Sequence, residues 1–316
     1  MADLMPDSKF IGNEKTIKRL RSLAKSGRIA HAYLFAGPDG IGKKRAALRF
    51  ARTLLCEKKT ADPCGKCGSC GRSERGTHPG LKVIEREKDR KDILIRQVRE
   101  LIRELSFVGE GPRIVVIDDA HRMNEEAMNA LLKTLEEAPD RVLLVLVTPA
   151  PSMLLPTIRS RCQTVLFFPI PEEELVPLLD LPKEDALFVA SLAEGSAARA
   201  LELAGEIDEW RGEVREILEK IGTGDINGVI EGLSKIRDVS RTRDKARRIL
   251  RIAALSLRQA LREKAGAPLP HLPASGRKTE IDDLADQLEI LLDHERMIDR
   301  NVNVSLAVEN ALLRIE

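Results

Sequence analysis

The sequence is poor in aromatic side chains and carries almost no excess charge of either sign. Aromatic residues make up 3% of the 316 residues, and 52 basic residues nearly balance 50 acidic residues, which gives a net charge of +2. Proteins that hold single-stranded nucleic acid usually combine a basic groove with aromatic stacking, and duplex binding needs clustered positive charge. These shortages argue against a protein that binds nucleic acid by bulk charge or base stacking alone.

Long apolar runs are also missing. No apolar stretch reaches the roughly 18 residues of a membrane span, and the N-terminal segment MADLMPDSKF lacks the basic start and apolar stretch of a secretory signal. Four of the five cysteines are clustered, which favours metal binding in a reducing compartment over a disulfide framework. We therefore expect a cytoplasmic protein with no part in a membrane.

One hydroxyl is missing from an otherwise complete phosphate-loop pattern, G-x-x-x-x-G-K-[ST]. The segment GPDGIGKK supplies Gly37, Gly42 and Lys43, with Gly40 inside the loop. Glycines let backbone N–H groups face phosphate oxygens, the lysine reaches the outer phosphates, and the hydroxyl holds Mg²⁺. Here Lys44 replaces the hydroxyl residue, and an ammonium cannot ligate a cation. The segment predicts a nucleotide-binding frame whose metal-dependent hydrolysis is impaired or lost.

Apolar runs alternate with amphipathic segments over the first 169 residues. Apolar strands are predicted at 31–36, 114–117, 142–147 and 165–168, with a further strand at 81–84, and helices are predicted at 10–30, 43–56, 93–105 and 124–137. Continuous apolar strands between helices indicate a parallel sheet covered on both faces. Strand-like runs stop after Pro169. The sequence therefore predicts an α/β domain at 1–169, a small helical lid domain at 170–208 and an all-α domain at 209–316.

Polar residues follow two of the predicted strands. Asp118 and Asp119 end the run VVIDD, and Asp118 is suited to holding Mg²⁺ beside a phosphate loop. Asp119 is one methylene shorter than the glutamate that usually orients water, so it is a poorer candidate base. The alternative is that both aspartates only end a strand and cap the next turn. Thr148 ends another strand, where its hydroxyl either senses a γ-phosphate or has no special role.

The clustered cysteines follow the spacing C-x₇-C-x₂-C-x₂-C. They are Cys56, Cys64, Cys67 and Cys70. Four thiolates within residues 56–70, with glycines between them, suit a closed tetrahedral structural zinc site, and the alternative is a set of free thiols. His78 is a spare ligand, although a loop position beside Pro79 is the more ordinary interpretation. Cys162 is remote in sequence and is expected to be a buried thiol.

Two arginine-rich segments favour different interpretations. Arg159 and Arg161 lie in TIRSRC, which we expect to form an exposed turn before the last strand. Arginine binds phosphate bidentately, so these side chains either stabilise charge at a neighbouring subunit or are solvated surface groups. The basic segment Arg241–Lys264 has apolar residues at helical spacing. We interpret it as a bundle helix with a solvated face rather than a DNA-binding or membrane-surface helix.

Several motifs in order resemble one family. They are HAYLFAGPDGIGKK, CGKCGSC, THPG, VVIDDAHRM, NALLKTLEEAP and RSRC. Their order is similar to that of bacterial clamp-loader subunits of the AAA+ class, strongly over residues 10–205 and weakly over the helical tail. The resemblance implies a P-loop AAA+ domain, a helical lid and a C-terminal collar domain. It also implies that zinc in the cysteine module is structural.

Departures from the active ATPases of that family resemble its delta-prime branch. Lys44 replaces the metal-binding hydroxyl, and Asp118-Asp119 replaces the usual Asp-Glu pair. Ala198 stands where the lid carries its sensor arginine, and Arg199 comes one residue late, about 100° around a helix. RSRC is kept. The resemblance therefore implies a subunit that does not hydrolyse ATP, whether or not it binds ATP. It also implies that the subunit assists a neighbouring ATPase.

The resemblance also implies a mechanism and partners. Such a subunit occupies one place in a hetero-pentameric ring with gamma/tau and delta subunits, within the DNA polymerase III holoenzyme. Arg161, with Arg159 as the second choice, would reach the ATP of the adjacent gamma/tau subunit while the ring places a sliding clamp on primed DNA. The alternatives are an active clamp-loader ATPase of the gamma/tau type and a nucleic-acid-binding zinc protein with a vestigial nucleotide fold.

Overall fold

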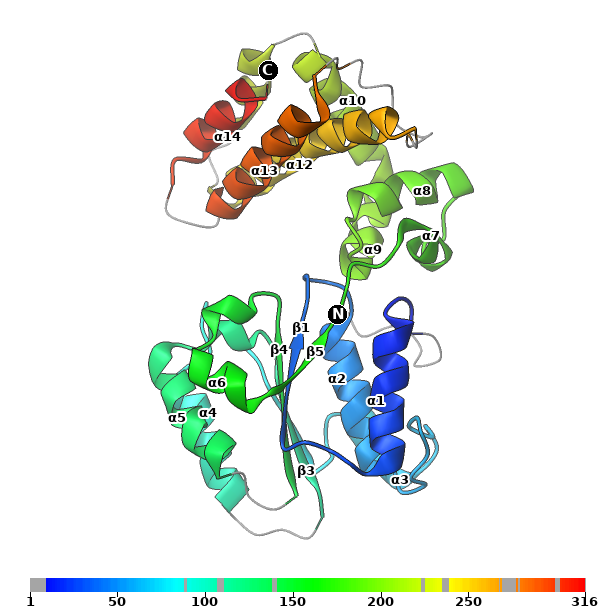
Figure 1. Cartoon of the computed structure of the whole chain (residues 1–316), viewed down its shortest axis with the longest axis vertical. Coiled ribbons are helices and arrows are strands. Elements are labelled where there is room, and N and C mark those ends of the chain that lie inside the picture. Colours follow the sequence, from blue (N-terminus) through cyan, green and yellow to red (C-terminus); the bar gives the residue numbers. More distant parts are fainter. Residues whose placement is uncertain are drawn as a thin grey trace. The chain divides into compact units, whose positions relative to one another are not determined.

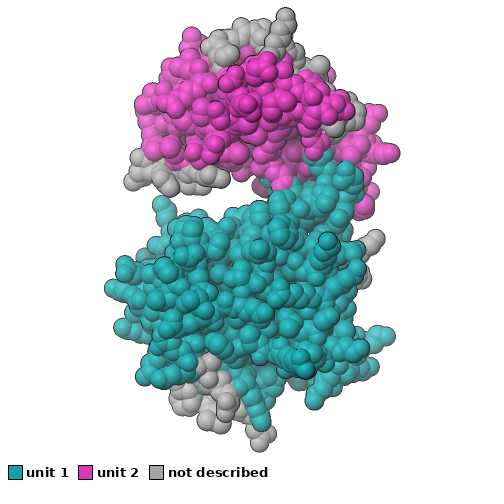
Figure 2. All heavy atoms as spheres, in the orientation of Figure 1, with its two compact units in different colours: residues 1–175, 195–199 teal, residues 176–194, 200–316 magenta. Residues whose placement is uncertain are grey.

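The computed structural model describes most of the chain as two compact units. The described residues are 10–87, 90–106, 111–137, 141–222, 225–234, 239–266, 268, 277, 279–298 and 302–315. Figure 2 colours the units, which comprise residues 1–175 with 195–199 and residues 176–194 with 200–316. The finer division into three domains, with boundaries after residues 169 and 208, stays a prediction.

The first unit contains a five-stranded, entirely parallel sheet. The strands are β1 (Ala32–Ala36), β2 (Leu81–Ile84), β3 (Arg113–Ile117), β4 (Val142–Thr148) and β5 (Gln163–Leu166). Their order is β2-β3-β4-β1-β5. In the register, Ala36 pairs with Thr148 on one side and with Leu166 on the other. The predicted parallel sheet is confirmed, although β5 lies two residues earlier than the strand expected at 165–168.

Helices cover both faces of this sheet (Figure 1). One face carries α1 (Glu14–Ser26) and α2 (Lys43–Leu55), and the other carries α4 (Ile95–Ser106), α5 (Glu125–Glu136) and α6 (Pro156–Arg161). Successive strand residues alternate between the two cores. Tyr33 and Phe35 lie in the core with Phe50 of α2, whereas Leu34 lies with Leu144 in the core below α4 and α5. Because β1, β3 and β4 are buried on both faces, they read as continuous apolar runs, whereas the outer strands β2 and β5 are partly exposed.

The short helices are the elements that the sequence predicted least well. The exposed turn expected at Thr157–Cys162 is wrong, because Pro156–Arg161 forms helix α6. Pro156 stands at its first position, where the fixed φ of proline suits a helix start. The cysteine segment contains a further helix, α3 (Gly68–Glu74). Two 3₁₀ turns, η1 (Ala120–Arg122) and η2 (Pro151–Met153), follow the ends of β3 and β4.

The remaining described elements are helical. They are α7 (Glu172–Leu175), η3 (Val176–Leu178), α8 (Lys183–Leu192), α9 (Ala197–Gly205), α10 (Ile207–Gly222), α11 (Ile226–Ser234), α12 (Val239–Lys264), α13 (Ile281–Ile298) and α14 (Val304–Leu313). Among the described residues no strand follows β5, as the sequence predicts. None of the helices described is both long enough and apolar enough to cross a membrane.

Helix α12 is the central helix of the second unit. It packs against α10, α13 and α14, and its Ile249, Ala253 and Leu257 are almost completely buried. Its arginines contact carboxylates of the same unit. The pairs are Arg248 with Glu206 at 3.0 Å, Arg251 with Glu295, and Arg258 with Glu194. The interpretation of the basic segment as a bundle helix is therefore confirmed.

Candidate functional site

The glycine-rich loop joins the end of β1 to the start of α2, as the sequence predicts. Gly40 and Gly42 have φ values of 71° and 92°, a left-handed conformation that suits glycine. At Gly37 a Cβ atom would collide with the carbonyl oxygen of Phe167. The carbonyl oxygen of Gly40 accepts a hydrogen bond from the N–H of Ala198 at 3.0 Å. The loop is therefore held in place by strand β1, helix α2 and the segment 195–199.

Lys43 lies inside this loop. Its side chain is 6% exposed, and its Nζ donates to the carbonyl oxygen of Pro38 at 2.5 Å. The carboxylate of Asp39 is 3.9 Å away. Burial lowers the pKa of Lys43, and the negative charges of Asp39, Asp118 and Asp119 oppose that effect. The structure thus places the predicted phosphate-binding lysine at the loop, next to the predicted acid pair.

Lys44 contacts two carboxylates, although 36% of its side chain is exposed. Its Nζ lies 3.0 Å from Glu85 Oε1 and 3.3 Å from Asp118 Oδ2. Glu85 follows β2 and Asp118 follows β3, so both acids stand at the carboxyl edge of the sheet. Burial acts to lower the pKa of Lys44, but the hydrogen bond to Glu85 and the charge of Asp118 outweigh it and raise the pKa. The sequence analysis missed Glu85, whose only signal was a carboxylate placed directly after a predicted strand.

The two strand-end aspartates have different partners. Burial raises the pKa of Asp118, and Lys44 offsets only part of this effect. Asp119 adopts a left-handed φ of 49° and lies 3.5 Å from the guanidinium of Arg86. Its side chain makes no capping hydrogen bond to the turn that follows. The acid pair is therefore tied to basic side chains of its own chain, and the capping alternative fails for Asp119.

Thr148 lies beside the phosphate loop and is completely buried. Its hydroxyl oxygen accepts a hydrogen bond from the N–H of Ala150 at 3.0 Å, and its carbonyl oxygen accepts one from the N–H of Gly37 at 3.4 Å. Accepting this bond leaves the hydroxyl its own proton, which it can donate. The position agrees with a role near a bound phosphate, and the sensing role itself stays a prediction.

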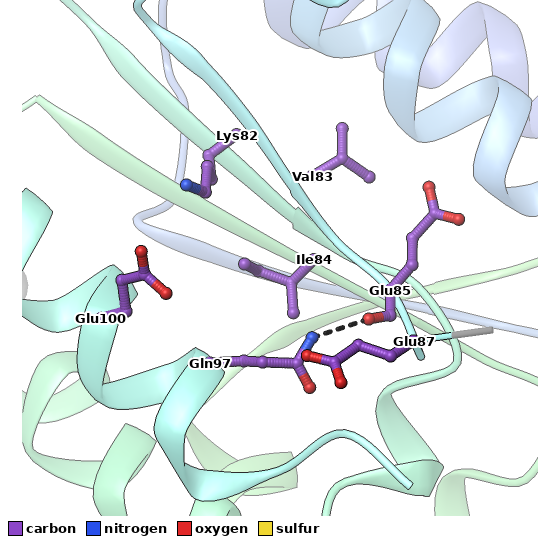
Figure 3. A pocket seen from close by; sticks show the side chains of 7 residues that line it. All are labelled: Lys82, Val83, Ile84, Glu85, Glu87, Gln97 and Glu100. Carbon is purple, nitrogen blue, oxygen red and sulfur yellow. Dashed lines mark hydrogen bonds between the residues drawn. The ribbon is translucent and has the colours of Figure 1, made fainter. Parts of the chain in front are cut away.

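A groove of about 370 Å³ lies along β2 and α4, apart from the phosphate loop (Figure 3). It is lined by Lys82, Val83, Ile84, Glu85, Glu87, Gln97 and Glu100. Gln97 Nε2 donates to the carbonyl oxygen of Glu85 at 2.9 Å, while the Glu85 carboxylate points away from Gln97. This bond fixes the backbone of Glu85, whose side chain contacts Lys44.

The structure brings together the four predicted zinc ligands. The sulfur atoms of Cys56, Cys64, Cys67 and Cys70 all lie within 4.8 Å of one another. The Cys56–Cys67 and Cys64–Cys70 pairs are 4.0 and 3.9 Å apart. A tetrahedral site with Zn–S bonds of about 2.3 Å separates its sulfurs by about 3.8 Å. The Cys67 sulfur accepts a hydrogen bond from the N–H of Cys70, which lowers the pKa of Cys67 to about 6. The four residues fit a structural zinc ion.

His78 supports the cysteine module without joining the ligand set. The N–H of Gly80 donates to His78 Nδ1 at 3.0 Å, so the proton of the neutral ring is on Nε2. Nε2 then donates to the hydroxyl oxygen of Ser69 at 2.9 Å, and that hydroxyl donates to the carbonyl oxygen of Leu55 at 2.7 Å. This chain of hydrogen bonds joins α3 to the end of α2.

Cys162 is buried in the core below α4 and α5, as expected. Its burial raises the pKa of this thiol to about 12.

The two candidate arginines differ in their contacts. Arg161 is the last residue of α6, and its Nη2 lies 2.6 Å from Glu136 Oε1 while Nη1 donates to the carbonyl oxygen of Thr157. Its side chain is 35% exposed. Arg159 lies on the same helix and is exposed. Both arginines are thus available at the surface of the described unit, and Arg161 is held in one orientation by Glu136.

Position 198, where the lid of an active family ATPase carries its sensor arginine, is an alanine in this chain. Ala198 stands in the first turn of α9 and uses its backbone N–H to contact the phosphate loop at Gly40. The hydroxyl of Ser196 accepts a hydrogen bond from the N–H of Arg199 at 3.3 Å. The side chain at position 198 is a methyl group, so it supplies no charge to a phosphate.

The comparisons with known proteins all point to subunits of DNA polymerase III. A family model described as "DNA polymerase III, delta subunit" matches residues 12–171. The delta-prime subunit of DNA polymerase III from Pseudomonas aeruginosa is 36% identical over 70% of this chain and 68% of its own length. The delta-prime subunit from Bacillus subtilis is 35% identical over 65% of this chain and 64% of its length.

A tau subunit is also similar. The DNA polymerase III subunit tau of Bacillus subtilis is 30% identical over 66% of this chain and 38% of its own length. The matched region of that relative is therefore a minor part of a longer protein. The family model and the delta-prime relatives, together with the phosphate loop and cysteine module on the parallel sheet, lead to one conclusion: the chain belongs to the delta-prime family of DNA polymerase III clamp-loader subunits.

Proposed function

We propose that this chain is a non-hydrolysing ring subunit that supplies an arginine to a neighbouring ATPase during sliding-clamp loading onto primed DNA. The observation that carries the proposal is the contact of Lys44 with Asp118. Hydrolysis at a phosphate loop needs Mg²⁺ held by the loop hydroxyl and the strand-end acid. Here the hydroxyl is replaced and the acid is occupied by an ammonium. The likeness to delta-prime and tau subunits supports gamma/tau and delta subunits as the ring partners.

Arg161 is the arginine that we assign to the neighbouring site. It lies at the end of a short helix, its guanidinium is oriented by Glu136, and it remains 35% exposed. A surface ion pair of this kind contributes roughly 1 kcal/mol or less, so a polyanionic triphosphate competes with Glu136 for the guanidinium. An arginine that reaches a phosphoryl group from a neighbouring subunit accelerates its transfer by about 10³–10⁵. Arg159 is the second choice.

The cysteine module has a structural role in this proposal. Four sulfur ligands close the coordination of zinc and leave no position for a substrate. The module is attached through Ser69 to the end of α2, the helix that begins at the phosphate loop. Zinc would therefore stabilise one end of the same helix whose other end carries Lys43 and Lys44.

The test is the ATPase rate of the assembled gamma/tau and delta loader with clamp and primed DNA. Replacement of the wild-type chain by Arg161→Ala should reduce turnover at the neighbouring site by about 10³-fold while the ring still assembles. Arg159→Ala is the comparison variant: it should leave turnover nearly unchanged if Arg161 is the acting arginine, and a large loss with Arg159→Ala alone would assign the role to Arg159. Unchanged turnover with Arg161→Ala, in a ring shown to be complete by size-exclusion chromatography, would rule out this role for Arg161.

The alternative is an active ATPase of the gamma/tau type. It requires Lys44 to leave Asp118 and a divalent ion to take its place. Steady ATP turnover by the isolated chain, abolished by Lys43→Ala, would support this alternative and contradict the non-hydrolysing role.

A further inference from the structure

The near-zero net charge of the chain conceals an uneven distribution of charge along it. Residues 14–80, which contain α1, α2 and the cysteine module, carry 16 of the 52 basic residues but five of the 50 acidic residues. This segment has a net charge of +11, and the rest of the chain has a net charge of −9. Zinc held by four thiolates would add two negative charges, so the segment would stay strongly positive. Such an asymmetry indicates a polyanionic partner.

These cations gather on one side of the first unit. Helices α1 and α2 cover the same face of the sheet, and the cysteine module is attached to both helices (Figure 1). Asp62 of the module contacts Arg21 of α1 at 2.8 Å and Arg49 of α2 at 3.0 Å. Because α1 buries Ile17 and Leu20 against the sheet, most of its charged residues face away from the sheet. The outer side of α1 and the cysteine module therefore belong to one surface, which we call the basic face.

The acidic residues of the basic face already have cationic partners. Asp62 is held by two arginines, as described above. The other pairs are Glu14 with Lys18 at 3.1 Å, Glu57 with Arg72 at 3.8 Å and Glu74 with Arg52 at 3.8 Å. The carboxylates of this surface therefore leave its remaining cations uncompensated.

Eight exposed basic side chains of the basic face have no carboxylate partner within the described part of the chain. Four lie on α1 and in the turn that follows it, namely Lys15, Arg19, Lys25 and Arg28. Four lie in the cysteine module and at the end of α3, namely Lys58, Lys59, Lys66 and Arg75. Elsewhere in the chain, the arginines of α12 contact carboxylates of their own unit. The basic face thus differs from an ordinary mixed surface in having cations without counter-charges.

The chemistry of the ligand follows from what this surface has and from what it lacks. The aromatic residues of the segment 14–80 are Tyr33, Phe35 and Phe50, and all three are buried in the core. Proteins that hold single strands combine basic grooves with aromatic stacking, so the basic face does not suit unpaired bases. The phosphates of a duplex, in contrast, need only cations. Contacts to phosphates carry no direct sequence information.

We propose that the basic face binds the phosphate backbone of duplex DNA without regard to sequence. The contact belongs to this chain alone, and it requires no nucleotide, no ring neighbour and no part of Arg161. It goes beyond the proposed function, in which the assembled loader as a whole meets primed DNA. A failure of the arginine role in the assembled loader would leave this contact unaffected.

The experiment measures binding of a fluorescent duplex of about 20 base pairs to the purified full-length, zinc-loaded chain, by anisotropy at several salt concentrations. Contact with about four phosphates gives a slope of about −3.6 for log K against log salt concentration. The affinity should therefore fall about 10²-fold between 50 and 200 mM salt. No duplex binding at 50 mM salt, binding that does not depend on salt, or tighter binding of a single strand of the same length would overturn the proposal.

Two sets of substitutions locate the contact on the basic face. The first set is Lys58→Gln, Lys59→Gln and Lys66→Gln, and the second set is Arg19→Gln, Lys25→Gln and Arg28→Gln. Each set should weaken duplex binding by about tenfold or more and reduce the salt slope by about 1 for each phosphate contact that is lost. The second set lies away from the zinc ligands, so it decides the proposal if the first set loses zinc or stability.

A matched control set changes the net charge by the same amount outside the basic face. It replaces exposed lysines of α5, α8 and α12, as Lys133→Gln, Lys183→Gln and Lys264→Gln. These substitutions should leave the affinity and the salt slope close to those of the wild-type chain. An equal loss of affinity in the control set would show that overall charge, and not this surface, governs binding, and it would overturn the proposal.

Discussion

The cysteine loop and the phosphate loop both arrange groups that suit a cation, yet they obtain the positive charge differently. In the cysteine loop four sulfurs converge within 4.8 Å, and four thiolates held that close would need a cation from outside the chain. Beside the phosphate loop Glu85 and Asp118 also converge, but Lys44 supplies the charge. The comparison teaches that cation-binding groups alone do not define a metal site. The decisive question is whether the chain already carries the counter-charge.

Removal of the external ion should have the largest effect. Structural zinc contributes on the order of 10 kcal/mol to the folding of small modules, so chelation or Cys67→Ala should unfold the segment around α3. Hydrogen exchange of the α3 amides and the zinc content of the protein are the measurements. Cys162→Ala is the control and should retain its zinc, because that thiol lies in the sheet core. Full protection of α3 after complete metal removal would contradict the zinc role.

The phosphate loop should instead depend on its backbone. Gly37→Ala would force a Cβ against the carbonyl oxygen of Phe167, and we expect a loss of about 3 kcal/mol in the free energy of unfolding. Gly27→Ala is a matched control, since Gly27 also has a positive φ but has open space around it. Its cost should be about 1 kcal/mol. Equal costs in urea unfolding would show that close packing does not hold the loop.

Removal of the internal cation should have a smaller effect that depends on pH. The raised pKa of Lys44 means that its ammonium adds stability at every pH below its ordinary value, and this stability is lost only as pH rises through the folded value. The raised pKa of Asp118 means that its carboxylate costs stability once it forms. Without Lys44 that cost is no longer offset. Lys44→Met should therefore destabilise the protein by up to about 1 kcal/mol, and more at pH 7.5 than at pH 5.

Urea unfolding at the two pH values measures this difference. Lys18→Met is the control, because its exposed pair with Glu14 should contribute little at either pH. A deficit of Lys44→Met that is larger at pH 5 than at pH 7.5 would show that Asp118 does not depend on the ammonium.

The Arg161–Glu136 pair is also a cation held by a carboxylate of its own chain. Its loss should give the smallest change in stability. Both side chains are partly exposed, so Glu136→Gln should alter the free energy of unfolding by less than about 0.5 kcal/mol. If Arg161 acts on a neighbouring ATP, its release from Glu136 should lower the ATP concentration needed for half-maximal turnover of the assembled loader. An unchanged ATP dependence would indicate that Glu136 does not compete for the guanidinium.

The sequence predicted the sheet and most of its helices well because both signals are local. All five predicted strands are present, and the helix predicted at 124–137 is α5. Helix α6 was interpreted as a turn, since six residues are too few to show helical periodicity. Helix α3 was not predicted, because the cysteine spacing was interpreted only as a metal site. Cys67 also caps that helix.

The candidate site was only partly predictable. The loop, the strand-end acids and the cysteines were identified, since each belongs to a contiguous motif. Glu85 was not, because it meets Lys44 only after β2 takes its place at the edge of the sheet beyond β3. The sequence analysis treated Lys44 only as a group that cannot ligate a metal ion. The structure adds that Lys44 has carboxylate partners of its own.

A cation that is part of a side chain is covalently attached, so no dissociation constant for an ion from solution describes its presence at the site. The local concentration of the Lys44 ammonium at Asp118 is set by a four-carbon stem and not by the composition of the medium. A site that recruits its ion divides the molecules between filled and empty forms by mass action. The tethered charge instead arrives when the chain folds. Every copy then carries the same charge at this edge of the sheet, so the population stays homogeneous when magnesium levels change.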